Sequence, residues 1–150
     1  MILYRYVIVV FPLIISLSFP NTASETNLKD LITGYWYGSS VITERLIDRK
    51  WIVHLAESGE FKIFFKEYRN NQLLKSWVES GTWNLRGTIH STTINRIIMG
   101  DGSEITPDTP DGIYYDEYEV LEINDKILKY RHIEDDVVYT VNRVPEGTEI

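Results

Sequence analysis

The feature that most constrains this chain is a succession of short runs rich in aromatic and β-branched residues, separated by very short joins that contain Gly, Asn, Asp or Ser. Runs that recur about every 8 to 12 residues are typical of all-β sandwiches and barrels. Because joins this short connect only antiparallel neighbours, the simplest topology is a meander in which each strand pairs with the next. The predicted strands cover residues 34–43, 50–56, 60–69, 72–79, 81–86, 88–96, 114–123, 126–133 and 137–144.

An open meander leaves two exposed edges, and closing it into a barrel removes them. We therefore predict an all-β, antiparallel up-and-down β-barrel of 8–10 strands, preceded by a short helix over residues 25–32. The 150-residue chain is the right size for one such domain, which we place at residues 25–150. The chain contains no cysteine, so disulfides, thiolate metal sites and cysteine nucleophiles are excluded.

The alternation of residue types along the runs predicts which side chains face inward. Phe61 and Ile63 share one face, for example, whereas Lys62 lies on the other. Large inward side chains would fill a narrow barrel or line a small pocket inside it. The residues that we expect to line the interior are Phe61, Ile63, Phe65, Trp83, Leu85 and Tyr139.

Residues 1–24 have the layout of a secretory signal peptide: Arg5 near the start, an apolar run that ends at Phe19, then Pro20 and small residues. An uncleaved membrane anchor is the alternative. Its uninterrupted apolar stretch of about 14 residues is shorter than the roughly 20 that a membrane-spanning helix needs. We therefore expect cleavage before residue 25, a secreted or periplasmic location, and no stable membrane insertion afterwards.

Gly34-Tyr35-Trp36, which follows the predicted helix and opens the first strand, resembles the glycine–any–tryptophan signature of lipocalins and the wider calycin group. Arg143, near the end of the last predicted strand, stands in the place of the arginine that covers this tryptophan in lipocalins. The resemblance is closest to the short lipocalin-like domains of exported bacterial proteins. It implies that Trp36 and Arg143 close one end of the barrel. The alternative is that Gly34 simply begins a strand and Arg143 is a surface charge.

Residues 97–113 form a long predicted connection that contains three glycines, two prolines and four carboxylates. Connections of this length are usually functional lids or disordered segments, and proline prevents this one from continuing a sheet. Tyrosine and carboxylate side chains at its end suit contact with a basic protein partner, although a solvated loop with one tyrosine in the core is the plainer alternative. The possible partner surface consists of Asp108, Asp111, Tyr114, Tyr115, Asp116, Glu117 and Tyr118.

The sequence contains no nucleophile elbow and no phosphate-binding glycine loop. Its histidines, His54, His90 and His132, lie on three separate runs without the spacing of a metal site, so we expect no metal and no cofactor. The net charge of −7 argues against a nucleic-acid partner.

Taken together, these features predict a monomeric protein that binds a small, partly apolar ligand inside the barrel and is not an enzyme, with residues 97–113 as a lid. The alternative function is an envelope protein-binding module, such as an inhibitor or an immunity-type protein, that uses the acidic and tyrosine-rich surface. An enzyme would rest on analogy of fold alone.

Overall fold

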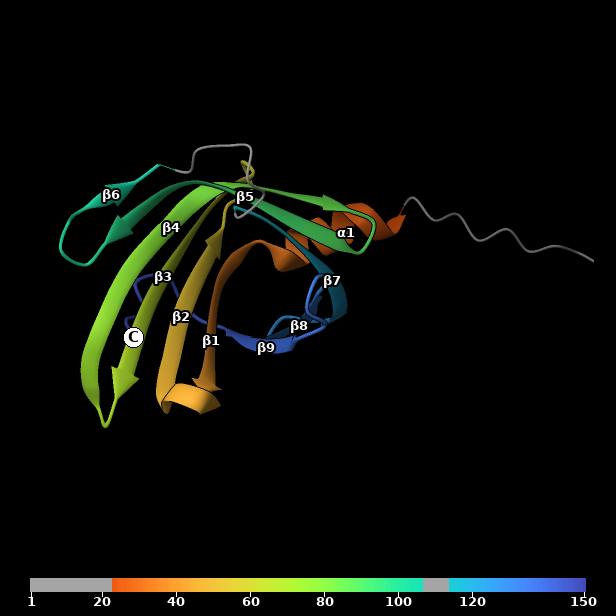
Figure 1. Cartoon of the computed structure of the whole chain (residues 1–150). Helices are drawn as coiled ribbons and strands as arrows, with labels where there is room; N and C mark the ends of the chain where they lie inside the picture. The colour runs from red at the N-terminus through yellow and green to blue at the C-terminus, as the bar shows by residue number, and fades with distance from the viewer. Residues whose placement is uncertain (1–22, 107–113) are drawn as a thin grey trace, which may run out of the picture.

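The computed structural model describes residues 23–106 and 114–150 (Figure 1). A helix, α1 (Ala23–Ile32), precedes the strands, and no helix in these two segments is long and apolar enough to cross a membrane. The strands are β1 (Gly34–Ile42), β2 (Ile47–Leu55), β3 (Glu60–Arg69), β4 (Gln72–Arg86), β5 (Ile89–Met99), β6 (Glu104–Ile105), β7 (Tyr115–Ile123), β8 (Ile127–His132) and β9 (Val138–Arg143), with a short 3₁₀ helix η1 (Thr43–Arg45) between β1 and β2.

Within the described segments, eight strands close into a barrel in which every neighbouring pair is antiparallel. Each barrel strand pairs with the next one around the barrel, with β5 pairing directly with β7, and β9 returns to β1. The short strand β6 pairs only with the end of β5. Tight turns make this meander possible: Asn70 and Asn71 adopt positive φ angles of 50° and 62°, which suit a two-residue hairpin between β3 and β4. The prediction of an all-β up-and-down barrel behind a short helix is confirmed.

The predicted turn at Ser80-Gly81 is wrong, because β4 runs through it as a single strand. The pairing register with β5 shifts between Ser80 and Gly81, which marks a β-bulge. A Cβ atom on Gly81 would lie 1.9 Å from the carbonyl oxygen of Thr93. Glycine is therefore needed here because the backbone of β5 approaches closely, and it does not end the strand.

The predicted connection over residues 97–113 is also shorter than expected. Its first residues continue β5 to Met99, and β6 then pairs back onto this extension. Asp101 stabilises the intervening turn by accepting hydrogen bonds from the backbone N–H and the hydroxyl of Ser103, at 2.9 and 2.7 Å. Arg96 and Glu104 pair across the two strands at 2.6–2.7 Å. Residues 107–113, which include Asp108 and Asp111, lie outside the described residues.

One end of the barrel is closed by Trp36, α1 and Arg143. The guanidinium of Arg143 lies 4.1 Å from the centre of the fully buried Trp36 ring, so the reading of Arg143 as a surface charge is wrong. Its Nη1 donates to the carbonyl of Thr33 at 2.8 Å and its Nη2 donates to the carbonyl of Leu31. The indole N–H of Trp36 donates to the carbonyl of Ile32 at 2.7 Å. These bonds satisfy backbone carbonyls at the end of α1 that the helix leaves unpaired.

Gly34 is required at this closed end for two reasons. Its φ angle is +123°, which side chains rarely allow, and an added Cβ atom would lie 2.6 Å from Nη1 of Arg143. Because Trp36 and Arg143 are direct partners in the β1–β9 register, the same contact joins the first and last strands. The glycine, the tryptophan and the arginine thus form one structural unit.

Candidate functional site

The barrel encloses a cavity of about 220 Å³, slightly below the roughly 300–1,000 Å³ typical of small-molecule sites. Its apolar lining residues are Ile32, Trp51, Val53, Leu55, Phe61, Ile63, Phe65, Ile94, Val120 and Leu128. Its polar or hydroxyl-bearing lining residues are Ser40, Arg49, Glu79, His90, Thr92, Asp116, Tyr118, Tyr130 and Tyr139. A cavity with mainly apolar walls and a few convergent polar groups is suited to a small amphipathic molecule.

Four of the six residues expected in the interior line this cavity: Phe61, Ile63, Phe65 and Tyr139. The other two, Trp83 and Leu85, are not among its lining residues. Trp83 is 5% exposed and belongs to the hydrophobic core, where its indole N–H donates to the carbonyl of Ala56 at 2.8 Å. Leu85 packs against the same core. Both residues adjoin the cavity residue His90: the ring centre of Trp83 lies 5.6 Å from that of His90, and Leu85 pairs with His90 in the β4–β5 register.

Arg49 brings a positive charge to the cavity wall, but this charge already has a partner. Its Nε and Nη2 atoms donate to one carboxylate oxygen of Glu67, at 2.9 and 2.6 Å. Glu67 is 9% exposed, and the guanidinium also lies 5.6 Å from the ring centre of Trp77. Two hydrogen bonds and a stacked ring hold Arg49 against β3 and β4.

Glu79 on β4 is a cavity carboxylate that, unlike Glu67, is not paired with a cationic side chain among the described residues. It accepts a hydrogen bond from the indole N–H of Trp77 at 2.7 Å and forms no salt bridge within the described segments. Burial raises the pKa of Glu79, and the nearby charge of Asp116 acts in the same direction, against the opposing effects of Trp77, Arg49 and Lys75. The raised pKa means that the fold disfavours the negative charge at this position.

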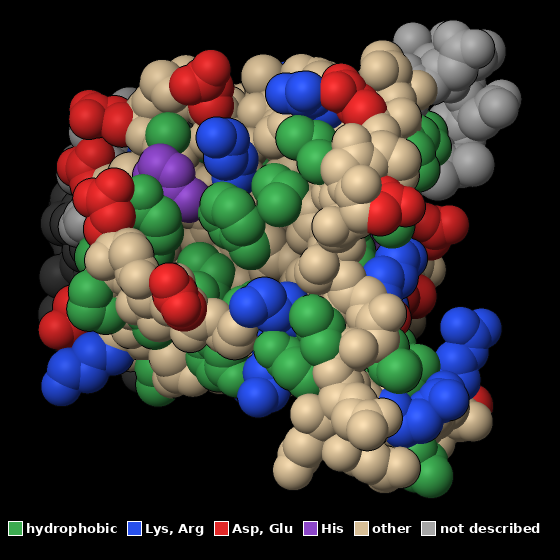
Figure 2. Space-filling model, turned by 90° about the vertical axis from the view of Figure 1, so that its left-hand side faces the viewer, with side chains coloured by type: hydrophobic (Ala, Val, Ile, Leu, Met, Phe, Trp, Pro, Cys, Tyr) green, Lys and Arg blue, Asp and Glu red, His purple; other side chains and the backbone are tan. Residues whose placement is uncertain are grey.

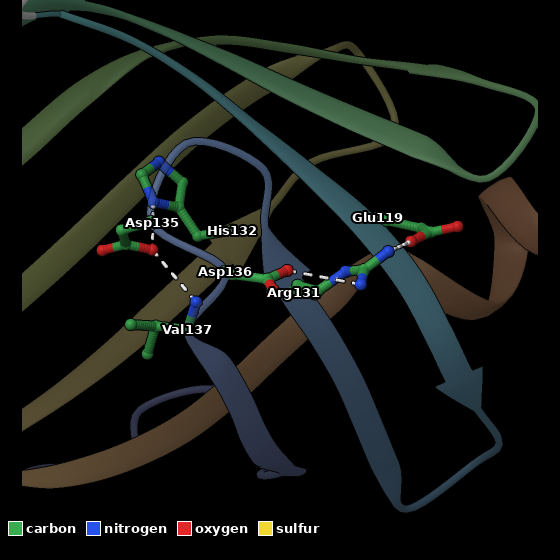
Figure 3. Close-up of polar contacts among 6 residues, drawn as sticks. All are labelled: Glu119, Arg131, His132, Asp135, Asp136 and Val137. Atoms are coloured by element: carbon green, nitrogen blue, oxygen red, sulfur yellow. Dashed lines mark hydrogen bonds and ion pairs between the residues drawn. The ribbon is translucent and has the colours of Figure 1, made fainter.

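Asp116 on β7 is the second cavity carboxylate, and it faces His132 at the end of β8. The distance from its Oδ1 to Nε2 of His132 is 3.4 Å. The other ring nitrogen, Nδ1, lies 2.7 Å from Asp135 in the β8–β9 turn, and Asp135 also accepts the N–H of Val137 at 3.1 Å (Figure 3). Partial burial lowers the pKa of His132, but Asp135 and Asp116 outweigh burial, so the pKa is raised.

Ion pairs of Arg131, on the outer face of β8, also hold the turn that positions His132. This guanidinium pairs with Glu119 of β7 and lies 3.3 Å from Asp136, as Figure 3 shows. Because neighbouring residues of a strand alternate between faces, Arg131 ties β8 to β7 on the outside while His132 reaches toward the cavity residue Asp116.

Aromatic rings connect these polar groups along the inner wall. The ring of Tyr118 lies 5.3 Å from Tyr130 and 5.1 Å from His132, measured between ring centres. Tyr139 lies 5.5 Å from Tyr130 and 5.9 Å from Trp51. Burial raises the pKa of both Tyr118 and Tyr130, so their hydroxyls stay protonated at neutral pH and are available as hydrogen-bond donors.

His90 on β5 is the cavity residue with an unmet bonding requirement. Its Nε2 atom is shielded from solvent and has no hydrogen-bond partner among the described residues. Its ring lies between Trp83 and Tyr118, at 5.6 and 5.8 Å. Burial lowers the pKa of His90 to about 4, so the ring is neutral at neutral pH. An unpaired buried polar atom costs roughly 1–3 kcal/mol, so this position lowers the stability of the fold.

The described residues of the suggested partner surface, at positions 114–118, do not form one surface. Strand β7 alternates, so Asp116 and Tyr118 line the cavity, while Tyr115 is 50% exposed and donates its hydroxyl to Glu117 at 2.7 Å. Tyr114 packs against the core. The alternation rule applied to this run would have separated the two sets.

The outer face seen in Figure 2 carries both charge types around a central group of hydrophobic side chains. Acidic side chains and histidine lie mostly toward its left and upper edges, whereas Lys and Arg are found in the middle and toward the lower right.

Among the described residues, no group of three or more His, Asp or Glu side chains has the arrangement of a metal site. No family model matches the chain, and a search of curated proteins finds no match either.

Proposed function

We propose that this protein is an exported, lipocalin-like binding protein that holds a small, partly apolar ligand inside its barrel and does not transform it. The observation that carries the proposal is the cavity itself, whose apolar and aromatic walls converge on a few polar groups. Sites for small molecules have this composition. The fold alone does not assign a function, so the proposal rests on the cavity.

The lipocalin-like assignment is supported by the Trp36–Arg143 contact at the closed end and by the conformation of Gly34. Export is supported by the sequence of residues 1–24, of which 1–22 lie outside the described residues. Binding without catalysis is supported by the lack of an activated nucleophile on the described part of the cavity wall. Ser40 and Thr92 carry hydroxyls there, but within the described residues neither is hydrogen-bonded to a histidine that could act as its base.

Titration calorimetry with small amphipathic compounds tests the proposal, using octanoate, octanol and 2-phenylethylamine as probes. At least one should bind the purified protein. Ile63→Trp should abolish that binding because the larger ring fills the cavity. The matched control is Val41→Trp, since Val41 is 61% exposed on β1. Failure of all three probes to bind, or equal binding to the Ile63→Trp variant, would overturn the proposal.

A further inference from the structure

The cavity wall carries more negative charge than its own cations neutralise. Glu79 accepts only the Trp77 indole N–H at 2.7 Å among the hydrogen bonds of the described residues. Asp116 shares His132 with Asp135, and Asp135 is the closer partner, at 2.7 Å against 3.4 Å. A cation placed between these carboxylates would stabilise both.

An anionic ligand fits this cavity poorly. Arg49 is the only Lys or Arg among the described lining residues, and both of its donor contacts go to Glu67. An anion would have to displace the largely buried Glu67 carboxylate from this ion pair. It would then face Glu79 and Asp116 across a cavity of about 220 Å³.

The remaining walls suit an organic cation better than a hydrated inorganic one. Trp51, Phe65 and the three tyrosines on β7, β8 and β9 present aromatic rings to the cavity. Aromatic ring faces attract ammonium groups and also contact the apolar body that carries them. The apolar residues Ile63, Ile94 and Val120 complete the wall.

His90 defines a second polar contact at a distance from the carboxylates. In the β5–β7 register, Thr92 pairs with Asp116 and His90 pairs with Tyr118. His90 is therefore displaced from Asp116 by two residues along the inner face, which is about 7 Å of strand. Its Nε2 atom has no hydrogen-bond partner in the part of the chain that the structure describes. Because less than 1 Å² of this atom is accessible to solvent, a ligand in the cavity reaches it only when the His90 ring turns toward the cavity.

From this arrangement we infer, on the basis of the proposed function, that the ligand is a small amine whose protonated nitrogen faces Glu79 and Asp116. An apolar, aromatic-sized body occupies the middle of the cavity. On binding, the His90 ring turns toward the cavity, and a hydroxyl or similar polar group at the other end of the ligand hydrogen-bonds to its Nε2 atom. The inference thus assigns a charge, a body and a second polar end to the bound molecule.

Calorimetric titration of the unmodified protein at pH 7 with four probes of similar size tests this inference. The probes are tyramine, 2-phenylethylamine, 2-phenylethanol and 3-phenylpropanoate. Tyramine should bind most tightly, 2-phenylethylamine at least tenfold more tightly than the neutral alcohol, and the anion most weakly. If the alcohol or the anion binds as tightly as the amines, the inference is overturned while the proposed binding function stands. If none of the four binds, the inference is overturned, and the proposed binding function is overturned as well only if octanoate and octanol also fail to bind.

Substitutions locate the two ends of the ligand. Glu79→Gln and Asp116→Asn should each weaken amine binding about tenfold and leave alcohol binding unchanged, because only the charge is removed. Glu122→Gln, at an exposed position of β7, is the matched control and should change neither. His90→Phe should remove the advantage of tyramine over 2-phenylethylamine without weakening the latter. An unchanged amine affinity in both carboxylate variants, or an unchanged tyramine advantage in His90→Phe, would contradict the inference.

Discussion

The closed end of the barrel and its cavity differ in how well their polar groups are hydrogen-bonded. At the closed end, the Arg143 guanidinium and the Trp36 indole have hydrogen-bond partners on the last residues of α1 and the residue after it. On the cavity wall, His90 carries an Nε2 atom without a partner in the described segments, and Glu79 has a raised pKa. The first arrangement stabilises the fold, whereas the second costs stability, and we propose that a bound ligand offsets this cost.

The largest effect is expected from a substitution that breaks the contacts of the closed end. Arg143→Ala removes the cover of Trp36 and leaves the carbonyls of Leu31 and Thr33 unpaired, so the free energy of unfolding should fall by about 3 kcal/mol. Arg143→Lys should recover only part of this loss, because lysine lacks the planar fork that reaches both carbonyls. Urea denaturation measures the change, with Arg45→Ala in the short helix η1 as the control. A loss below 1 kcal/mol for Arg143→Ala would contradict this account.

The next effect comes from the neutral, buried His90. Its pKa in the fold, about 4, lies below the value of about 6.5 in the unfolded chain, so between these values the unfolded chain binds the extra proton. Stability should therefore fall as the pH is lowered from 6.5 to 4, by a contribution on the order of 3 kcal/mol. His90→Phe should remove this contribution. Denaturation of both proteins at pH 7 and pH 4.5 measures it, and parallel losses in the two would show that His90 is not its source.

A smaller effect of opposite sign is expected at Glu79. Its pKa is raised in the fold, so the fold favours the protonated form, and stability is lost as the pH rises through this pKa. Glu79→Gln keeps the acceptor for the Trp77 indole and removes the charge. It should stabilise the protein at pH 7, by a gain smaller than about 1 kcal/mol, while it weakens amine binding. Thermal unfolding measures the stability, and a destabilised variant would mean that Glu79 serves the fold.

The smallest effect concerns the turn that holds His132. The pKa of His132 is raised in the fold, so its ion pair with Asp135 stabilises the protein at low pH. This stabilisation is lost as the pH rises through the pKa that His132 has in the folded state. Asp135→Asn should cost roughly 0.5 kcal/mol at pH 5.5, because the Asp135 side of the pair is about half exposed to solvent. The cost should be smaller at pH 8, where His132 has lost its charge. Urea denaturation at the two pH values gives the comparison. An equal cost at both would point to the turn geometry and not to the charge.

Much of the fold could be predicted because it depends on local patterns. Short joins indicate antiparallel neighbours, and Gly34, Trp36 and Arg143 indicate which strands meet at the closing seam. The bulge at Gly81 could not be distinguished from a turn, since glycine suits both and only the approach of Thr93 decides between them. Similarly, the run that ends at Met99 extends because β6 pairs back onto it.

The cavity could be predicted only in part. Alternation identifies the inward face, which gave Phe61, Ile63 and Phe65, but it does not give the height of a residue along the barrel. That height depends on how far neighbouring strands are staggered, and Trp83 is buried in the core without lining the cavity. The alternation of residue types along its strand also places Trp51 on the inward face, and Trp51 lines the cavity. The isolation of His90 depends on its surroundings, and no sequence pattern indicates it.

Nitrogen NMR of the His90 ring, with and without saturating tyramine, tests the central claim most directly, because it observes the unpaired atom itself. On binding, the signal of Nε2 should move as it gains a hydrogen bond, and 2-phenylethylamine should produce a much smaller shift. An Nε2 signal that does not change when tyramine is added would contradict the claim that the cavity of this barrel is completed by a ligand.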